Sequence, residues 1–169
     1  MADGAKRVML CGERTNDVKT LRIGPWIKDR ILLIDLGFYK HQIFARIEEN
    51  GGYFVSRLKN NADPSIVGVN RRWRGRTTDV VGKNLSEVLP GLTRQILDVE
   101  VEIAFKRRKY GGKQRKDVKH FRLVAVYNIE VEKYHLYLTN IPVDRFDAED
   151  IALLYSARWE IELIFKERI

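Results

Sequence analysis

Several residue types and patterns are scarce in this 169-residue sequence, and each scarcity excludes a class of protein. A lone cysteine, Cys11, rules out an internal disulfide and a CxxC metal site. No apolar run approaches the roughly 18 residues of a membrane span, and the first residues, MADGAKR, lack an apolar signal region. We therefore expect a cytoplasmic globular protein that forms one ordinary domain or part of a larger one.

The positive charge of the sequence is concentrated in one internal segment. The chain carries 31 Lys and Arg against 23 Asp and Glu, a net charge of +8. Between Arg57 and Arg122, 17 basic residues stand against 7 acidic ones, whereas the rest of the chain has a net charge of −2. A ribosomal or membrane surface would explain such an excess too, but the pattern favours contact with nucleic acid.

A strand, a helix and a second strand follow one another in the first third of the chain. Residues 31–35 (ILLID) form a continuous apolar run, which predicts a strand buried on both faces of a sheet. An amphipathic helix over 40–50 and a strand over 53–58 predict a parallel βαβ unit, and 7–11 is a further strand. Asp35 ends the buried strand, where α/β folds place ligands, although a turn or helix-capping aspartate would look the same.

Residues 60–141 predict a β-rich segment with two basic tips. A period-two strand at 97–105 and strands at 120–128 and 134–140 form a β-meander, and 85–88 is a helical turn. Basic side chains at the tips could neutralise phosphates while Trp73 stacks on bases; the alternative is a solvated hairpin with Trp73 buried. The candidate DNA-binding residues here are Arg57, Arg71, Arg72, Trp73, Arg74, Arg76, Arg107, Arg108 and Lys109.

The final stretch, residues 147–169, predicts one helix that begins with a capping box. Tyr155, Arg158 and Glu162 fall within roughly 60° of one another on this helix and border its buried face. The same spacing occurs on ordinary solvated helices, where an Arg–Glu pair contributes only about 0.3–0.5 kcal/mol. A phenol, a guanidinium and a carboxylate held at the edge of a core nevertheless indicate a candidate site.

Two segments of the sequence together resemble insertion-sequence transposases of the IS4 type. The stretch LLIDLGFYKHQIFARIEENGGYFVSRLKNNAD resembles the second catalytic-aspartate region of that family. The stretch YSARWEIELIFKERI is similar to the family's Tyr-x2-Arg-x3-Glu-x6-Lys signature. The resemblance covers most of residues 13–60 and 134–169, and the two motifs occur in the family's order on either side of a β-rich insertion.

The resemblance implies an α/β fold: a partial ribonuclease-H-like mixed sheet with flanking helices, interrupted by a β-rich insertion. Residues 1–59 would form the first part of this core, and residues 60–141 the basic β-rich insertion. Residues 142–169 would contain the core helix that carries the catalytic glutamate. The resemblance further implies double-stranded DNA at transposon ends as partner, a homodimer in a full-length transposase, and a nucleoid-associated place in the cytoplasm.

The resemblance also implies a catalytic site. The family's Asp, Asp and Glu hold two divalent metals, and matching positions make Asp35 and Glu162 catalytic and metal-binding residues. Oxygen ligands suit Mg²⁺ or Mn²⁺, and two such ions about 3.5–4 Å apart can activate the attacking oxygen and stabilise the leaving one. Tyr155 and Arg158 would contact the DNA backbone near the scissile phosphate, where Arg158 could neutralise developing charge.

The sequence departs from the family's pattern at two positions. Ile169 stands where the signature has its lysine, and Lys166 on the same face could partly substitute in DNA binding. The first catalytic aspartate has no good candidate, because Asp3 lies only 32 residues before Asp35. We therefore expect a DDE transposase fragment, truncated at both ends, that cleaves no transposon ends alone. The alternatives are a non-catalytic DNA-binding protein, a nuclease whose missing carboxylate is supplied differently, and a remnant without a present role.

Overall fold

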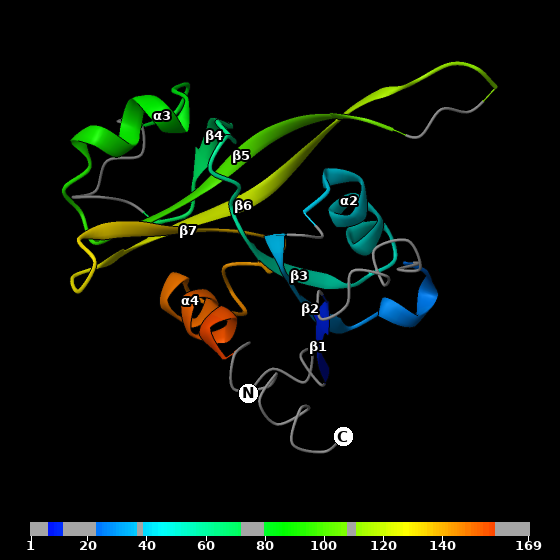
Figure 1. The fold of residues 1–169 in the computed structure, drawn as a ribbon, viewed down its shortest axis with the longest axis horizontal. Helices are drawn as coiled ribbons and strands as arrows, with labels where there is room; N and C mark the ends of the chain where they lie inside the picture. Colours follow the sequence, from blue (N-terminus) through cyan, green and yellow to red (C-terminus); the bar gives the residue numbers. More distant parts are fainter. Residues whose placement is uncertain (1–6, 12–22, 37–38, 72–79, 108–110, 158–169) are drawn as a thin grey trace.

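The computed structural model of this chain describes residues 7–11, 23–36, 39–71, 80–107 and 111–157. Within these residues, strands form one mixed sheet in the spatial order β1-β2-β3-β7-β6-β5-β4 (Figure 1). Helices pack on both faces of this sheet, which confirms the predicted α/β class. The strands are β1 (Arg7–Cys11), β2 (Arg30–Ile34), β3 (Tyr53–Arg57), β4 (Ser65–Val69), β5 (Ile96–Lys106), β6 (Lys116–Asn128) and β7 (Lys133–Thr139).

The predicted parallel βαβ unit is present. β2 and β3 run parallel, and α2 (His41–Glu49) connects them. β1 pairs in parallel with the other edge of β2, so β2 lies inside the sheet. The turn from α2 into β3 requires a glycine at position 52, because a Cβ there would lie 2.6 Å from Cγ1 of Ile27.

The side chains of β2 alternate between two separate cores. On one face, Leu32 and Ile34 pack in a cluster with α2 and with the inward-facing residues of β5 and β6. On the other face, Ile31 and Leu33 pack in a cluster with α4 (Ala148–Ser156). This two-sided burial explains why β2 is a continuous apolar run and does not alternate with polar residues.

Strands β4 to β7 join the parallel strands through β7. β7 pairs antiparallel with β3, and Oγ1 of Thr139 donates a hydrogen bond of 2.5 Å to the carbonyl of Phe54. The side-chain amide of Asn140 donates to the carbonyl of Gly52 and accepts from the backbone N–H of Phe54, each at 2.9 Å. The β-rich segment therefore extends the sheet of the βαβ unit.

The predicted β-meander of β5, β6 and β7 is confirmed, as is the helical turn α3 (Leu85–Val88). β4 was not predicted, because SIVGV is short, contains Gly68 and has an irregular register between Ile66 and Gly68. Two short 3-10 turns, η1 (Pro25–Ile27) and η3 (Leu89–Gly91), complete the described elements. None of the described helices is long and apolar enough to cross a membrane.

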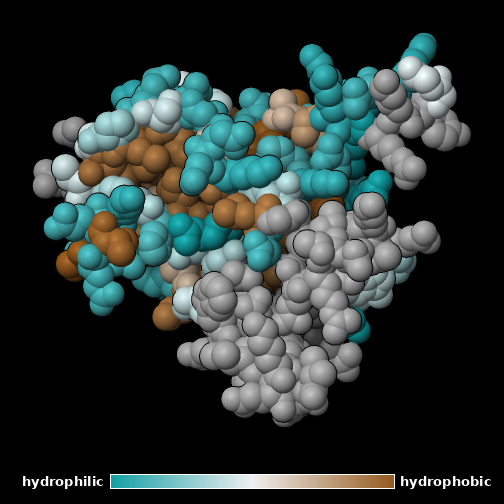
Figure 2. All heavy atoms as spheres, viewed as in Figure 1, coloured by the Kyte–Doolittle hydropathy of each residue, from teal (hydrophilic) through white to brown (hydrophobic). Residues whose placement is uncertain are grey.

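β5 and β6 form a long two-stranded arm. Their 11 and 13 residues pair from Ile96 opposite Val126 to Lys106 opposite Lys116. The far end of this arm extends beyond the rest of the sheet at the upper right of Figure 1, and hydrophilic residues cover it in the same view in Figure 2. The side-chain amide of Gln42 on α2 donates a hydrogen bond of 2.7 Å to the carbonyl of Lys106, which ties α2 to the arm.

Candidate active site and nucleic-acid surface

The carboxyl ends of the parallel strands β2 and β3 lie at one edge of the sheet. Asp35 directly follows β2, is half-buried, and is the predicted catalytic aspartate. Arg57, one of the predicted DNA-binding residues, is the last residue of β3. The structure therefore places a carboxylate and a cation at the ends of adjacent strands, at the edge where open α/β sheets bind their ligands.

Helix α4 reaches this edge through Tyr155. Tyr155 is only 9% exposed, and the centroid of its ring lies 5.6 Å from that of Tyr137. Its hydroxyl donates a hydrogen bond of 3.2 Å to the carbonyl of Ile34, the residue immediately before Asp35. The two sequence motifs, 121 residues apart at this contact, thus meet at the carboxyl end of β2.

The remaining predicted residues of the final helix are Arg158, Glu162 and Lys166, and all three lie outside the described residues. The separation of the Asp35 and Glu162 carboxylates therefore stays a prediction. Among the residues that the structure describes, no three His, Cys, Asp or Glu side chains gather as a metal site would require. The carboxylate of Asp35 is the hard oxygen donor that Mg²⁺ and Mn²⁺ prefer, so it fits the predicted role of one ligand within a larger set.

The start of α4 is fixed by the capping box that the sequence predicts. Asp147 Oδ1 accepts a hydrogen bond of 2.9 Å from the backbone N–H of Asp150, and Asp150 Oδ2 accepts one of 3.3 Å from the N–H of Asp147. The hydrogen bond from the Asp150 backbone lowers the pKa of the Asp147 carboxyl. The charged form of Asp147 therefore stabilises the first turn of α4.

A second group of ionisable side chains, Tyr39, His41 and Lys59, lies near the ends of β2 and β3. Nε2 of His41 lies 3.3 Å from the hydroxyl of Tyr39, and Nζ of Lys59 lies 5.5 Å from the centroid of the Tyr39 ring. Burial raises the pKa of Tyr39 to about 12, so the hydroxyl keeps its proton at neutral pH. Burial, and then the charge of Lys59, lower the pKa of His41. Sequence reasoning missed this group, although all three residues follow the ends of predicted strands.

The predicted DNA-binding residues divide by whether the structure describes them. Arg71 is exposed and pairs with Glu149 of α4 at 2.9 Å. Arg57 lies with its guanidinium 5.7 Å from the centroid of the Tyr137 ring. Outside the described residues are Arg72, Trp73, Arg74, Arg76, Arg108 and Lys109.

Arg107 is held between two elements. Its guanidinium binds Asp117 of β6 at 2.8–2.9 Å and Glu49 of α2 at 2.5 Å. Burial alone would lower the pKa of Arg107, but the hydrogen bonds to Glu49 and Asp117 raise it above the ordinary value. Its single positive charge therefore already faces two carboxylates within the protein. In contrast, Lys113, Arg115 and Lys116 are exposed at the end of the arm, where cations can meet phosphates.

Sequence reasoning also missed a buried ion pair near α4. The side chains of Asp98 on β5 and Arg122 on β6 are each 2% exposed and lie 2.6 Å apart at their closest atoms. The period-two pattern of β5 indicated only that Asp98, Glu100 and Glu102 share one face of the strand. The pairing of β5 with β6, which brings an acid and a base to adjacent strands of one hairpin, is the signal that could have found this pair.

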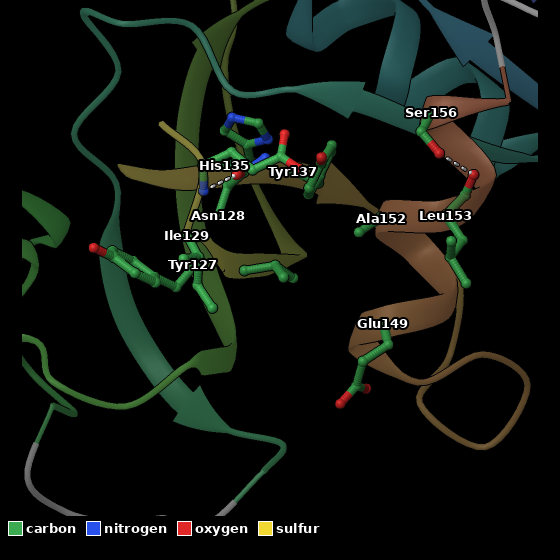
Figure 3. Close-up of a pocket in the computed structure, with 11 residues that line it drawn as sticks. Tyr127, Asn128, Ile129, His135, Tyr137, Glu149, Ala152, Leu153 and Ser156 are labelled. Atoms are coloured by element: carbon green, nitrogen blue, oxygen red, sulfur yellow. Dashed lines mark hydrogen bonds between the residues drawn. The ribbon is translucent and has the colours of Figure 1, made fainter. Parts of the chain in front are cut away.

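A groove of about 730 Å³ separates α4 from the β6–β7 turn (Figure 3). Tyr127 and Ile129 line it from the turn, and Ala152 and Leu153 line it from the helix. Burial, and then the charge of Arg57, lower the pKa of His135, which lines the same groove. Asp35 does not line the groove, so the predicted metal-binding aspartate and this apolar groove are separate features.

Comparisons with known proteins match nearly the whole chain. A family model described as "Transposase DDE domain" matches residues 12–168. The transposase for insertion sequence element IS1151 of Clostridium perfringens is 23% identical over 177 residues, covering 89% of this chain and 37% of that protein. The transposase for insertion sequence element IS231F of Bacillus thuringiensis subsp. israelensis is 23% identical over 176 residues, covering 90% and 36%.

A third relative matches a shorter part of the chain at higher identity. The putative transposase InsL for insertion sequence element IS186A of Escherichia coli (strain K12) is 34% identical over 97 residues, covering 54% of this chain and 25% of that protein. The chain spans little more than a third of the length of the first two relatives. Together the matches confirm the resemblance to insertion-sequence transposases of the IS4 type.

Proposed function

This chain belongs to the DDE transposase family, and from that premise we propose that it forms part of a catalytic domain for metal-dependent DNA cleavage and strand transfer. One observation carries the proposal: the hydroxyl of Tyr155 binds the carbonyl of Ile34. This contact joins the helix of the family's glutamate signature to the strand that ends in Asp35. It lies within the cluster in which Ile31 and Leu33 of β2 pack against α4, and it is the hydrogen bond that brings Tyr155 next to Asp35.

We further propose that the mixed sheet is a partial ribonuclease-H-like core. The parallel strands β1, β2 and β3 support this, as do the helices on both faces of the sheet. In this proposal β4 to β7 are the β-rich insertion, which joins the core through the pairing of β7 with β3.

Asp35 and Glu162 are the residues that would hold Mg²⁺ or Mn²⁺. When bound, two such ions activate the attacking oxygen and stabilise the leaving oxygen of a phosphodiester. Arg158 would neutralise charge on the phosphate. Tyr155 would hold α4 against the end of β2, and in this proposal it would contact the DNA backbone there. Only two of the family's three carboxylates have matching positions in these 169 residues, so we expect the chain by itself to cleave no transposon ends.

The DNA of the transposon ends would lie against the basic segment. The exposed cations Lys113, Arg115 and Lys116 at the end of the arm support this, together with the predicted residues of the Arg71–Arg76 tip. Such a protein would act on the nucleoid within the cytoplasm, and a full-length transposase would act as a homodimer.

The experiment is Mn²⁺ binding to the purified 169-residue chain, followed by the electron paramagnetic resonance of free Mn²⁺. We expect weak binding that either Asp35→Asn or Glu162→Gln lowers at least about tenfold, because each removes a charged oxygen ligand. The matched control is Asp29→Asn, which changes an exposed aspartate at the other end of β2. Equal Mn²⁺ affinity in all four proteins would contradict the site.

The exposed cations of the arm also favour a second candidate, a non-catalytic DNA-binding protein. Such a protein would bind duplex DNA with a steep dependence on salt, and neither Asp35→Asn nor Glu162→Gln would change Mn²⁺ or DNA binding. The Mn²⁺ titration of the same variants therefore separates the two candidates.

A further inference from the structure

We propose that Arg122 is a positioning residue for the site at Asp35. Its guanidinium fixes where α4 begins, and α4 carries Tyr155 to the carboxyl end of β2. The inference rests on the proposed function, because it concerns how α4 is placed against the end of β2 at the proposed site. No part of the Tyr-x2-Arg-x3-Glu-x6-Lys signature includes Arg122 or its partner Asp98.

The Arg122 guanidinium is bound on one side by Asp98 in a two-pronged pair. Nε donates to Oδ1 of Asp98 at 2.8 Å, and Nη2 donates to Oδ2 at 2.6 Å. Parallel hydrogen bonds of this kind fix the plane of the guanidinium as well as its position. The direction in which the remaining nitrogen, Nη1, points is therefore set by β5 and β6.

Nη1 of Arg122 donates to the segment that leads from β7 into α4. It binds the carbonyl of Ile141 and the carbonyl of Phe146, each at 2.9 Å. Ile141 lies two residues after β7, and Phe146 directly precedes the N-cap residue Asp147. One nitrogen thus holds both ends of the lead-in, so the sheet determines where the first turn of α4 is placed.

Asp98 holds the first turn of α4 by a second route. Its backbone carbonyl accepts the N–H groups of Asn70 and Arg71 at 2.8 and 3.2 Å, and its Oδ1 accepts the side-chain amide of Asn70 at 3.1 Å. Arg71 in turn pairs with Glu149 in the first turn of α4 at 2.9 Å. The beginning of the helix is therefore tied to Asp98 from both sides, and its Tyr155 end is tied to Ile34.

Stability alone does not account for this arrangement. A buried ion pair can often be replaced by well-packed apolar residues at no cost in stability. What apolar residues cannot replace is the pair of directed hydrogen bonds from Nη1 to Ile141 and Phe146. Lysine could keep the charge beside Asp98, but its single ammonium lacks the planar fork that reaches the carboxylate and both carbonyls together.

Hydrogen exchange of the purified 169-residue chain tests the inference directly. We compare Arg122→Lys with the double variant Asp98→Leu/Arg122→Met, which removes both charges of this ion pair together. In both, we expect exchange of the α4 amides to rise about tenfold or more, with less than about a twofold change in β2 and β3. The matched control is Arg107→Met, which removes a second arginine of the arm that binds carboxylates, in this case Glu49 and Asp117, and that lies away from α4.

Two outcomes would overturn the inference. One is α4 exchange that is unchanged in both variants. The other is exchange that rises equally in α4, β2 and β3, which is the result that a purely structural role would give. If Arg122→Lys does not fold, the double variant decides.

The Mn²⁺ titration tests whether Arg122 affects the proposed metal site. It also distinguishes a failure of this inference from a failure of the proposed function. We expect Arg122→Lys to lower Mn²⁺ affinity about fivefold, because Asp35 and Glu162 would be held together less firmly. If Asp35→Asn leaves Mn²⁺ binding unchanged, the proposed metal site fails, and the exchange measurement alone decides whether Arg122 positions α4. If Asp35→Asn lowers the affinity and Arg122→Lys does not, the positioning role is wrong and the metal site stands.

Discussion

Two arginines on the β5–β6 arm, Arg122 and Arg107, both bind carboxylates but lie in very different surroundings. The Arg122–Asp98 pair is 2% exposed on both sides, whereas the Arg107 side chain is 23% exposed and its partners Glu49 and Asp117 are 43% and 39% exposed. Water screens the interactions of Arg107, which we call the outer pair, and can replace its hydrogen bonds. No water can replace those of the Arg122–Asp98 pair, which we call the inner pair. Arginine–carboxylate bonds therefore fix the position of neighbouring backbone at Arg122, whereas at Arg107 they only link two surface elements.

The largest expected effect comes from breaking the inner pair on one side. Arg122→Met leaves the Asp98 carboxylate buried without its partner, and we expect the free energy of unfolding to fall by about 3–5 kcal/mol. Urea denaturation followed by tryptophan fluorescence measures this loss. Adding Asp98→Leu should restore most of the stability; a loss below about 1 kcal/mol in the single variant would show that the pair is not desolvated as the structure has it.

The exposed cations at the end of the arm should matter for binding DNA and hardly at all for stability. Alanine at Lys113, Arg115 and Lys116 should weaken binding to duplex DNA and reduce the slope of log affinity against log salt by about 2–3. Fluorescence anisotropy across a range of salt concentrations measures both quantities. Alanine at Lys28 and Lys133, two exposed lysines away from the arm's end, serves as the control, and an equal reduction there would remove the arm from the DNA surface.

A moderate effect is expected at the start of α4, where it depends on pH. The pKa of Asp147 is lowered in the folded chain, so its stabilising contribution is present above the unfolded value and is lost as pH falls through the lowered one. Asp147→Ala should cost about 1 kcal/mol at neutral pH.

Asn also caps helices but has no charge to lose, so Asp147→Asn is the matched control for this pH dependence. Once corrected for the intrinsic pH dependence of exchange, the protection of its α4 amides should not fall as pH drops below the ordinary carboxyl pKa, whereas that of the parent chain should. Identical acid profiles for the two proteins would contradict the role of the Asp147 charge.

The smallest effect completes the comparison at the outer pair. Arg107→Met should lower the free energy of unfolding by only about 0.2–1 kcal/mol, because the partners regain water when the arginine is removed. This loss should shrink in high salt, whereas that of Arg122→Met should not. A loss at Arg107 as large as the one at Arg122 would contradict the contrast between the two surroundings.

The sequence predicted those elements whose pattern of apolar and polar residues is complete within a short segment of the chain. The apolar run of β2 and the amphipathic spacing of α2 predicted both elements, and the capping box predicted the beginning of α4. β4 has too short a signal of this kind, and its pairing with β5 comes from the tertiary fold. The local residue pattern thus predicts helices and strands better than it predicts which other elements pack against them.

The candidate site shows the same division. The strand-ending position of Asp35 could be read from the sequence, and the structure has it at the carboxyl end of β2. The partner of Tyr155 could not be predicted, because Ile34 lies 121 residues away along the chain. In the sequence, Asp98 resembled a solvated acid on the alternating strand β5. Periodicity shows which residues share a face of the strand, but it does not show that the segment leading into α4 covers the face with Asp98.

The pairing of β3 with β7 has a consequence for the order in which the chain can fold. The hydrogen bond from Thr139 to Phe54 spans 85 residues, and the pairing cannot form until β7 has been synthesised and placed. Contacts of such long range slow folding, because a large loop must close before they contribute. As the ribosome delivers the chain, β2 and β3 must therefore wait with one edge unpaired, and that edge is where self-association during synthesis would begin.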